Sequence, residues 1–332
     1  MKILVTGGAG FVGSRLAREL LQRGRLAGNE IGELVVADLC PPPAWLMADA
    51  RVRAYTGVLV DLCRQLSDEK FDLIFHLAAA VSAECEADFE LGLRSNLYTT
   101  HALLESLRTT GSAPRFVFAS SLAVFGSDPG LAMPSIVGDD TLPTPQSSYG
   151  IQKFICEQLV TDYTRKGFID GRSARLMTVV VRPGRPNGAA SGFLSSIIRE
   201  PLNGQGVVCP VAPETMVALG STASAIEGLI AVAEASTDAL GGRTALNLPA
   251  LTVTVNEMLD ALEAVAGKSA RALVRFEPDA AITQIVGTWP PVIDSSRAQR
   301  LGLTADPDFI FIVRAYIRDY ADNLRTTSSA AL

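Results

Sequence analysis

The sequence has few of the residues that build metal sites and disulfide frameworks. Its 332 residues include two histidines and five cysteines, and the cysteines at positions 40, 63, 85, 156 and 209 form no C-x-x-C pair. An odd number of cysteines without such pairs argues against a disulfide framework and against a structural zinc site. We therefore expect no metal in the functional site.

Clusters of positive charge and long apolar runs are also missing. The formal net charge is −6 at pH 7 and no run of Lys and Arg stands out, so neither nucleic acid nor an anionic membrane is an expected partner. No apolar run reaches the ~18 residues that cross a membrane, and the one at residues 3–5 is too short for a secretory signal. We expect a cytoplasmic protein that binds a small molecule.

What the sequence does contain is enough apolar material for a large core, since 48% of its residues are hydrophobic. Over the first 180 or so residues, short apolar runs alternate with segments of helical period. This alternation predicts an α/β fold, a doubly wound parallel sheet with crossover helices. The expected strands are residues 2–6, 33–37, 51–55, 72–76, 115–119 and 175–181, and the expected helices are 11–23, 88–108, 147–166 and, further on, 193–202.

A glycine-rich turn follows the first expected strand directly. Gly7, Gly10 and Gly13 have the spacing G-x-x-G-x-x-G between that strand and the first expected helix. Gly7 permits a tight turn, Gly10 lets the backbone approach a pyrophosphate, and Gly13 allows the helix to pack closely on the strand. The positive helix end, with Phe11 and Val12, attracts the phosphate charge. The pattern is typical of a Rossmann-type dinucleotide site, although such glycines alone are a weak signal.

Three further segments fit the rest of a dinucleotide. Asp38 ends the second apolar run, where a carboxylate accepts hydrogen bonds from ribose hydroxyls and repels a 2′-phosphate, which favours NAD over NADP. Its alternative is a solvated residue in a turn. Asp61, with Leu62, either accepts from the adenine amino group or caps a helix. His76 precedes small residues around Ala78, where backbone can lie against the cofactor, and is itself either catalytic or a hydrogen-bonded core residue.

A tyrosine and a lysine share one face of an expected helix. Tyr149 and Lys153 are four residues apart, and an ammonium beside a phenol, together with the positive nicotinamide ring of NAD⁺, stabilises the phenolate that an acid/base catalyst needs. The same spacing also occurs by chance in surface pairs. Upstream, Ser120 and Ser121 directly follow the expected strand 115–119 and reach the edge of the sheet where ligands bind. We favour Ser121 as the substrate contact, with Ser120 as the competitor; both can instead satisfy local backbone groups.

Together these segments resemble the extended short-chain dehydrogenases/reductases, also called the NAD-dependent epimerase/dehydratase family. The resemblance rests on T-G-G-x-G-F-x-G at residues 6–13, Asp38, H-L-A-A at 76–79, Asn96, Ser120-Ser121 with V-F-G at 124–126, Y-x-x-x-K at 149–153 and R-P-G at 182–184. It implies that Ser121, Tyr149 and Lys153 form a catalytic triad, that Asn96 supports the cofactor site, and that Pro183 lies against the nicotinamide. It also implies a homodimer that pairs the helices carrying Asn96 and Tyr149.

Departures from the family's patterns narrow the reaction. The 4,6-dehydratases carry an Asp-Glu pair after the catalytic hydroxyl, whereas this chain has Leu122-Ala123. Epimerases carry an arginine that binds the diphosphate, and the segment that we align with it, residues 214–222, has no cation. Residues 182–193 and 199–202 instead resemble the branch that oxidises the C2 hydroxyl of a four-carbon sugar acid, such as D-erythronate, to the 2-keto acid. This resemblance implies a small substrate.

Four residues are candidates for contact with such a substrate: Ser82, Arg185, Asn187 and Ser191. Arg185 either pairs with the carboxylate in a forked geometry or lies on the surface, and the sequence leaves open whether Arg199 takes that role. Three functions remain: the dehydrogenase, a nucleotide-sugar epimerase with no net NADH, and a redox-silent NAD-binding regulator. An intact Ser-Tyr-Lys set argues against the third.

The composition changes to Pro, Gly, Ser and Asn after residue 181. We expect an NAD-binding domain over residues 1–181 and a smaller, mainly substrate-binding lobe over 182–325, from which the chain can return to the first domain. The alternative is one continuous domain. The polar residues 326–332 are expected to fray.

Overall fold

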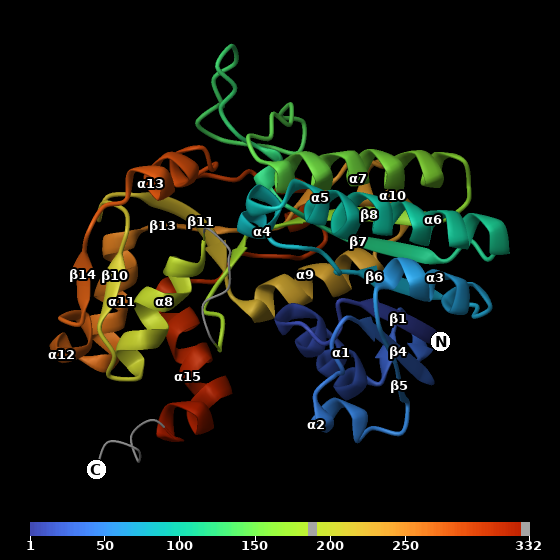
Figure 1. Cartoon of the computed structure of the whole chain (residues 1–332), viewed down its shortest axis with the longest axis horizontal. Coiled ribbons are helices and arrows are strands. Elements are labelled where there is room, and N and C mark those ends of the chain that lie inside the picture. The colour runs from blue at the N-terminus through green and yellow to red at the C-terminus, as the bar shows by residue number, and fades with distance from the viewer. Residues whose placement is uncertain (185–190, 327–332) are drawn as a thin grey trace.

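A seven-stranded parallel sheet forms the centre of the molecule in the computed structural model, which describes residues 1–184 and 191–326 (Figure 1). The strand order is β12-β8-β7-β6-β1-β4-β5. The strands are β1 (Lys2–Thr6), β4 (Glu33–Asp38), β5 (Val52–Thr56), β6 (Leu73–His76), β7 (Arg115–Ser121), β8 (Asp170–Leu176) and β12 (Leu246–Asn247). Because β1 lies between β6 and β4, the direction of winding changes there, and ligands bind at the carboxyl ends of strands at such a point.

Helices cover both faces of this sheet, which confirms the predicted doubly wound architecture. Successive residues of a strand point to opposite faces. Ile3 and Val5 pack with α1 (Phe11–Arg23) and α9 (Thr222–Glu234), and Leu4 packs with the helices of the other face. Those helices are α3 (Leu59–Ser67), α6 (Thr99–Thr110) and α7 (Ser148–Arg165) (Figure 1).

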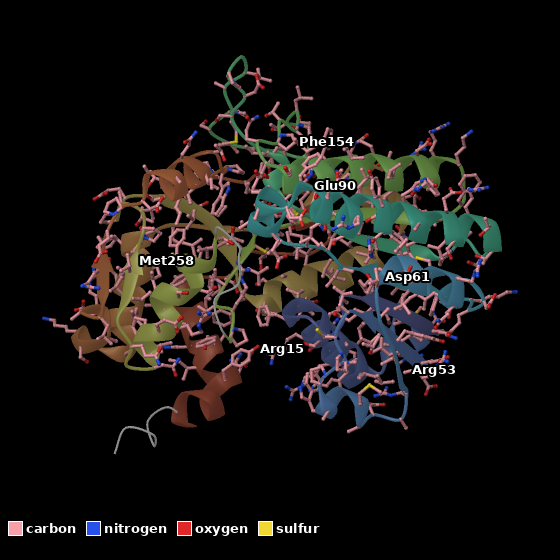
Figure 2. The ribbon with its side chains drawn as sticks, viewed as in Figure 1. Arg15, Arg53, Asp61, Glu90, Phe154 and Met258 are labelled. Carbon is pink, nitrogen blue, oxygen red and sulfur yellow. The ribbon has the colours of Figure 1, made fainter. Side chains whose placement is uncertain are left out.

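A smaller lobe with its own apolar core lies beside the sheet. Its main helices are α8 (Gly192–Leu202), α11 (Val255–Ala266), α12 (Lys268–Arg271), α13 (Ala280–Gly287) and α15 (Phe309–Thr326). Its strands are β9 (Thr178–Val179), β11 (Met216–Gly220) and β13 (Leu251–Thr254), with β10 (Val207–Cys209) and β14 (Val274–Phe276) as a separate pair. Met258 of α11 is fully buried in this core, and Figure 2 shows it within the lobe.

The chain after residue 181 contributes to both parts of the molecule. β12 pairs with β8 in the main sheet, and α9 packs on that sheet, whereas α8 and α11 belong to the smaller lobe. The two parts also meet at Arg15 of α1, which forms an ion pair with Asp319 of α15 (Figure 2).

Two predicted elements differ from the observed ones in bounds or in type. The strand expected at residues 175–181 is instead β8, which begins at Asp170, followed by the short β9. The buried Arg172 of β8 interrupts the apolar pattern; its Nη1 donates to the carbonyls of Val232 and Ala235 at 2.7 and 2.5 Å and thereby caps the end of α9. The helix expected at residues 88–108 is divided by a π-helical turn into the segments α5 (Phe89–Gly92), η1 (Leu93–Tyr98) and α6.

Short elements complete the described chain: β2 (Arg25–Leu26), β3 (Asn29–Glu30), α2 (Ala44–Met47), α4 (Ser82–Ala87), η2 (Leu122–Val124), α10 (Thr237–Leu240) and α14 (Ser296–Arg300). Within residues 1–184 and 191–326, no helix has both the length and the apolar character needed to cross a membrane.

Candidate active site

The glycine turn between β1 and α1 packs against its neighbours more closely than side chains would allow. Gly7 has a φ of +69°, and a Cβ there would lie 2.7 Å from the backbone nitrogen of Ala78. A Cβ on Gly13 would lie 2.2 Å from the carbonyl oxygen of Gly7. α1 begins after Gly10 without a side-chain cap, and the N–H groups of residues 11–13 precede the first intrahelical bond, from Ser14 N–H to the Gly10 carbonyl. This cradle fits the pyrophosphate of a dinucleotide.

Acidic residues follow at the ends of β4 and β5. The Asp38 carboxylate accepts hydrogen bonds from Ala9 N–H at 3.0 Å and from Cys40 N–H at 3.1 Å, so it lies beside the glycine turn. Its remaining lone pairs fit the ribose hydroxyls of a dinucleotide. Asp61 is exposed in the first turn of α3, whose N-cap is Val58. The interpretation of Asp61 as a helix cap was therefore wrong, and the contact to adenine stays a prediction.

The start of α7 is pressed against the end of β7. Gly150 lies so close to η2 that a Cβ on it would come within 2.1 Å of the carbonyl oxygen of Ala123. This close approach places the phenol of Tyr149 near the Ser121 hydroxyl, which lowers the pKa of the phenol. The Lys153 Nζ lies 5.6 Å from the centroid of the Tyr149 ring and donates to the carbonyl of Ala119 at 2.8 Å. The tertiary structure thus brings the three predicted catalytic residues together.

The environment of Tyr149 favours the neutral phenol over the phenolate. Burial raises the pKa of Tyr149 to about 12, against the opposing effects of the Ser121 hydrogen bond and the Arg182 charge. Burial also lowers the pKa of Lys153 to about 8. The chain by itself therefore keeps the phenol protonated at neutral pH. We predicted that two positive charges favour the phenolate: the ammonium of Lys153 and the nicotinamide ring of NAD⁺. The first belongs to the chain, whereas the second comes from a ligand that the chain has to bind.

The two serines of β7 point to different partners. Ser120 donates to Oε1 of Glu157 at 2.5 Å, and Glu157 forms a buried two-pronged ion pair with Arg175, with N–O distances of 2.9 and 2.8 Å. Ser120 thus belongs to a core network. Ser121 accepts from the N–H of Ala123 at 3.1 Å and meets the phenol, so the geometry favours Ser121 over Ser120 as the substrate contact.

Asn96 supports the site through the backbone of the loop after β6. Its Oδ1 accepts from Ala80 N–H at 2.7 Å, and its Nδ2 donates to Oε1 of Gln152 at 2.8 Å. Gln152 lies on α7 between Tyr149 and Lys153. The amide of Asn96 therefore connects the cofactor-side loop with the catalytic helix, in line with the predicted supporting role.

His76 is a neutral core residue. Its Nε2 lies 2.9 Å from Thr100 Oγ1, which itself donates to the carbonyl of Asn96, so Nε2 carries the proton. Nδ1 then accepts from Thr6 Oγ1 at 2.7 Å. Burial lowers the pKa of this imidazole to about 3. Both ring nitrogens are occupied, which supports the core interpretation over the catalytic one.

The residues predicted to contact the substrate lie in different parts of the chain. Ser82 is the first residue of α4, a helix held to the start of α7 by a 2.6 Å hydrogen bond from Ser148 N–H to Glu86. Ser191 precedes α8 and accepts from Arg182 Nη2 at 2.7 Å. Arg185 and Asn187 lie outside the described residues. The other residues predicted for the cofactor site are partly or fully buried: Val12, Leu62, Ala78 and Pro183.

Arg182 was missed as a site residue, although it heads the R-P-G segment. Its side chain is partly buried, and its charge acts on the phenol of Tyr149. The signal in the sequence is a cation placed directly before Pro183, the residue expected at the nicotinamide. Arg199 is buried and fixes the backbone of Arg182, because its Nη1 donates to the Arg182 carbonyl at 2.7 Å. Its Nη2 lies 2.5 Å from Glu200.

Comparisons with known proteins agree with this geometry. The chain is 48% identical over 325 residues to a D-erythronate dehydrogenase of Cupriavidus necator, covering 96% of this chain and 98% of that protein. It is 41% identical over 324 residues to a D-erythronate dehydrogenase of Haemophilus influenzae, covering 96% and 99%.

A solved structure described as a nucleoside-diphosphate-sugar epimerase from Agrobacterium tumefaciens superposes with a TM-score of 0.90 at 40% identity, covering 97% of this chain and 95% of that one. The model of the NAD dependent epimerase/dehydratase family matches residues 3–222, a span that holds the glycine cradle and the Ser-Tyr-Lys trio. The chain belongs to the NAD dependent epimerase/dehydratase family.

Proposed function

We propose that this protein is a cytoplasmic, NAD-dependent dehydrogenase that oxidises the C2 hydroxyl of a small sugar acid, such as D-erythronate, to the 2-keto acid. One observation carries the proposal: identity to two D-erythronate dehydrogenases extends over 96% of the chain. The convergence of Ser121, Tyr149 and Lys153 at the end of β7 supports it, because oxidation of an alcohol needs a group that takes the hydroxyl proton.

The residues of the chain have separate tasks in this reaction. When bound, NAD⁺ supplies the acceptor for the hydride that leaves C2. Ser121 holds the substrate oxygen in line, and Tyr149 takes its proton as the C–O bond becomes a carbonyl. Lys153, fixed by its bond to the Ala119 carbonyl, stabilises the phenolate while it is protonated. One hydride and one proton leave the alcohol, so the products are the 2-keto acid, NADH and H⁺.

Four residues remain our proposed contacts for the rest of the substrate: Ser82, Arg185, Asn187 and Ser191. Ser82 begins α4 beside α7, and Ser191 precedes α8 in the smaller lobe. A substrate held between the two parts of the molecule would be shielded from water, which strengthens the electrostatic contacts.

A nucleotide-sugar epimerase is the second candidate, favoured by the description of the Agrobacterium structure. The two functions differ in whether NADH accumulates. Purified protein is incubated with NAD⁺ and a panel of tetronates, pentonates and UDP-sugars, and the absorbance of NADH is followed. We expect NADH with D-erythronate. Interconversion of a UDP-sugar without NADH would contradict the proposal.

We also propose that two copies pair through the helices carrying Asn96 and Tyr149. Exposed apolar side chains on this face support it: Phe89 (59% exposed), Tyr98 (52%), Ile151 (47%) and Ile155 (39%). They lie on α5, η1 and α7, which run side by side (Figure 1). Apolar groups gathered on neighbouring helices are typical of a protein interface.

A further inference from the structure

We infer that Arg182 is the anchor that binds the carboxylate of the substrate at the site of Tyr149 and thereby selects acids over neutral polyols. The inference rests on the proposed function, because it names the part of the site that recognises the acid group. It assigns this role to neither Arg185 nor Arg199, the two arginines that the sequence offered.

The backbone of Arg182 is fixed from both sides. Its N–H donates to Ser195 Oγ at 3.1 Å, and its carbonyl accepts from Arg199 Nη1 at 2.7 Å. Ser195 and Arg199 are both buried, with 1% and 4% of their surface exposed, and both belong to α8. A residue held in this way presents its side chain in one orientation, as a binding group must.

The guanidinium of Arg182 is held in one orientation, but only some of its N–H groups have acceptors among the described residues. Its Nε donates to the carbonyl of Val179 at 3.1 Å, and its Nη2 donates to Ser191 Oγ at 2.7 Å. Among the described residues, none accepts a hydrogen bond from Nη1. An arginine has five N–H donors in a planar fork, so an edge of this fork remains for a ligand.

The positive charge has no carboxylate partner within residues 1–66, 68–184 and 191–320, the part whose side chains are described. Arg199, its neighbour, is paired with Glu200, whereas Arg182 forms no ion pair there. The adjoining residues 185–190 contain no Asp or Glu. A partly buried cation beside a second cation is unfavourable unless an anion joins it, and both burial and the Arg199 charge lower the pKa of Arg182.

The position of this charge decides which anion it fits. Arg182 acts electrostatically on Tyr149, at the catalytic end of the site, whereas the cradle for the pyrophosphate is at Gly7–Gly13. The C2 hydroxyl of a 2-hydroxy acid is attached next to its carboxylate. When that hydroxyl lies at Tyr149 and Ser121, the carboxylate therefore lies close to the phenol as well. Arg182 is the cation that can reach it there. A forked arginine matches the two oxygens of a carboxylate.

The inference is tested by a double-mutant cycle in which the charge of Arg182 and the charge of the substrate carboxylate are removed singly and together. D-erythronate and its uncharged amide are titrated by calorimetry into the protein saturated with NADH, which measures binding without turnover. We expect wild-type protein to bind the acid at least about 30-fold more tightly than the amide. In Arg182→Gln this ratio should fall to near one, and Arg182→Lys should retain part of it because the charge stays.

Arg275→Gln is the matched control, since the Arg275 side chain is 73% exposed in the same lobe, and its ratio should equal that of wild type. An unchanged ratio in Arg182→Gln, equal weakening of acid and amide, or loss of the ratio in Arg185→Gln instead would overturn the inference while leaving the proposed function in place. Wild-type protein that neither binds D-erythronate nor forms NADH with it would contradict both. If Arg182→Gln does not fold, the lysine variant carries the test through its smaller ratio.

Discussion

In the proposed mechanism the phenol of Tyr149 has to lose its proton before it can accept that of the alcohol, and burial opposes this loss by raising its pKa to about 12. Replacing Tyr149 by Phe removes the acceptor of the substrate proton. We expect kcat to fall by at least about 100-fold while the affinity for NADH, measured by fluorescence titration, stays within about 2-fold. Tyr163→Phe on the same helix is the control and should leave kcat almost unchanged. Activity near wild type in Tyr149→Phe would refute the mechanism.

Lys153 makes the stability of the nucleotide-free protein depend on pH. Its pKa is about 8 in the folded protein because of burial, and about 10.5 when unfolded, so the unfolded chain binds the proton more strongly between these values. The cost of burying the ammonium is therefore full below pH 8 and is relieved as the pH rises towards 10.5. Relative to Lys153→Met, the free energy of unfolding of wild type should rise by about 2–3 kcal/mol from pH 7 to 10 in urea titrations. A constant difference between the two proteins would show that this pKa is not lowered.

The carboxylate of Asp38 binds the glycine turn through Ala9, and we predict that it also accepts hydrogen bonds from the ribose. Asp38→Asn keeps a hydrogen-bond acceptor for the turn and removes the charge that repels a 2′-phosphate. We expect the ratio of kcat/KM for NAD⁺ over NADP⁺ to fall by about 10-fold or more, and further in Asp38→Arg. An unchanged ratio in both variants would contradict the assignment of Asp38 to the ribose.

At the scale of elements, the cofactor site depends on how closely α1 approaches the turn after β1. A Cβ on Gly13 would lie 2.2 Å from the Gly7 carbonyl, so Gly13→Ala has to push the helix away from the turn. We expect the affinity for NADH to fall by about 10-fold or more in a fluorescence titration. Gly32→Ala is the control, because no atom lies within 4 Å of the added methyl group. Equal affinities in the two variants would show that this approach does not matter.

The same dependence on packing holds for the catalytic helix. Tyr149 and Lys153 share a face of α7, but only the contact of Gly150 with the Ala123 carbonyl brings that face to the end of β7. The π-helical turn η1 on the neighbouring segment lets the Asn96 side chain reach both the Ala80 backbone and Gln152. Neither contact leaves a trace in local sequence periodicity.

For the whole molecule, the exposed apolar face of α5, η1 and α7 predicts the oligomeric state. Light scattering should give the mass of a dimer for wild-type protein at micromolar concentration. A charge in the centre of an apolar interface is strongly unfavourable, so the double variant Ile151→Asp/Ile155→Asp should give a monomer. Ile285→Asp, at an apolar position 42% exposed on α13, is the control and should remain dimeric. A monomeric wild type would contradict the proposal.

Much of the fold and part of the candidate site could be predicted from the sequence. The alternation of apolar runs and helical segments predicted the parallel sheet, and α1 has the predicted bounds, because buried strands and amphipathic helices have strong local patterns. Gly7 and Gly10 lie in the turn after β1 and Gly13 lies in the first turn of α1, so their close spacing in the sequence predicted the cradle. The strand at Asp170–Leu176 was missed because its buried Arg172 caps a helix that is distant in the chain.

The sequence by itself therefore determined the class of fold and the residue types of the site, since both follow from local patterns and short motifs. Only the tertiary structure decided which of the two β7 serines lies near the phenol and that His76 is neutral. It also decided that Arg199 is paired with Glu200, whereas Arg182 has no carboxylate partner among the residues whose side chains are described. The physical reason is that burial and the choice of hydrogen-bond partner depend on segments far apart in the chain, which no local pattern records.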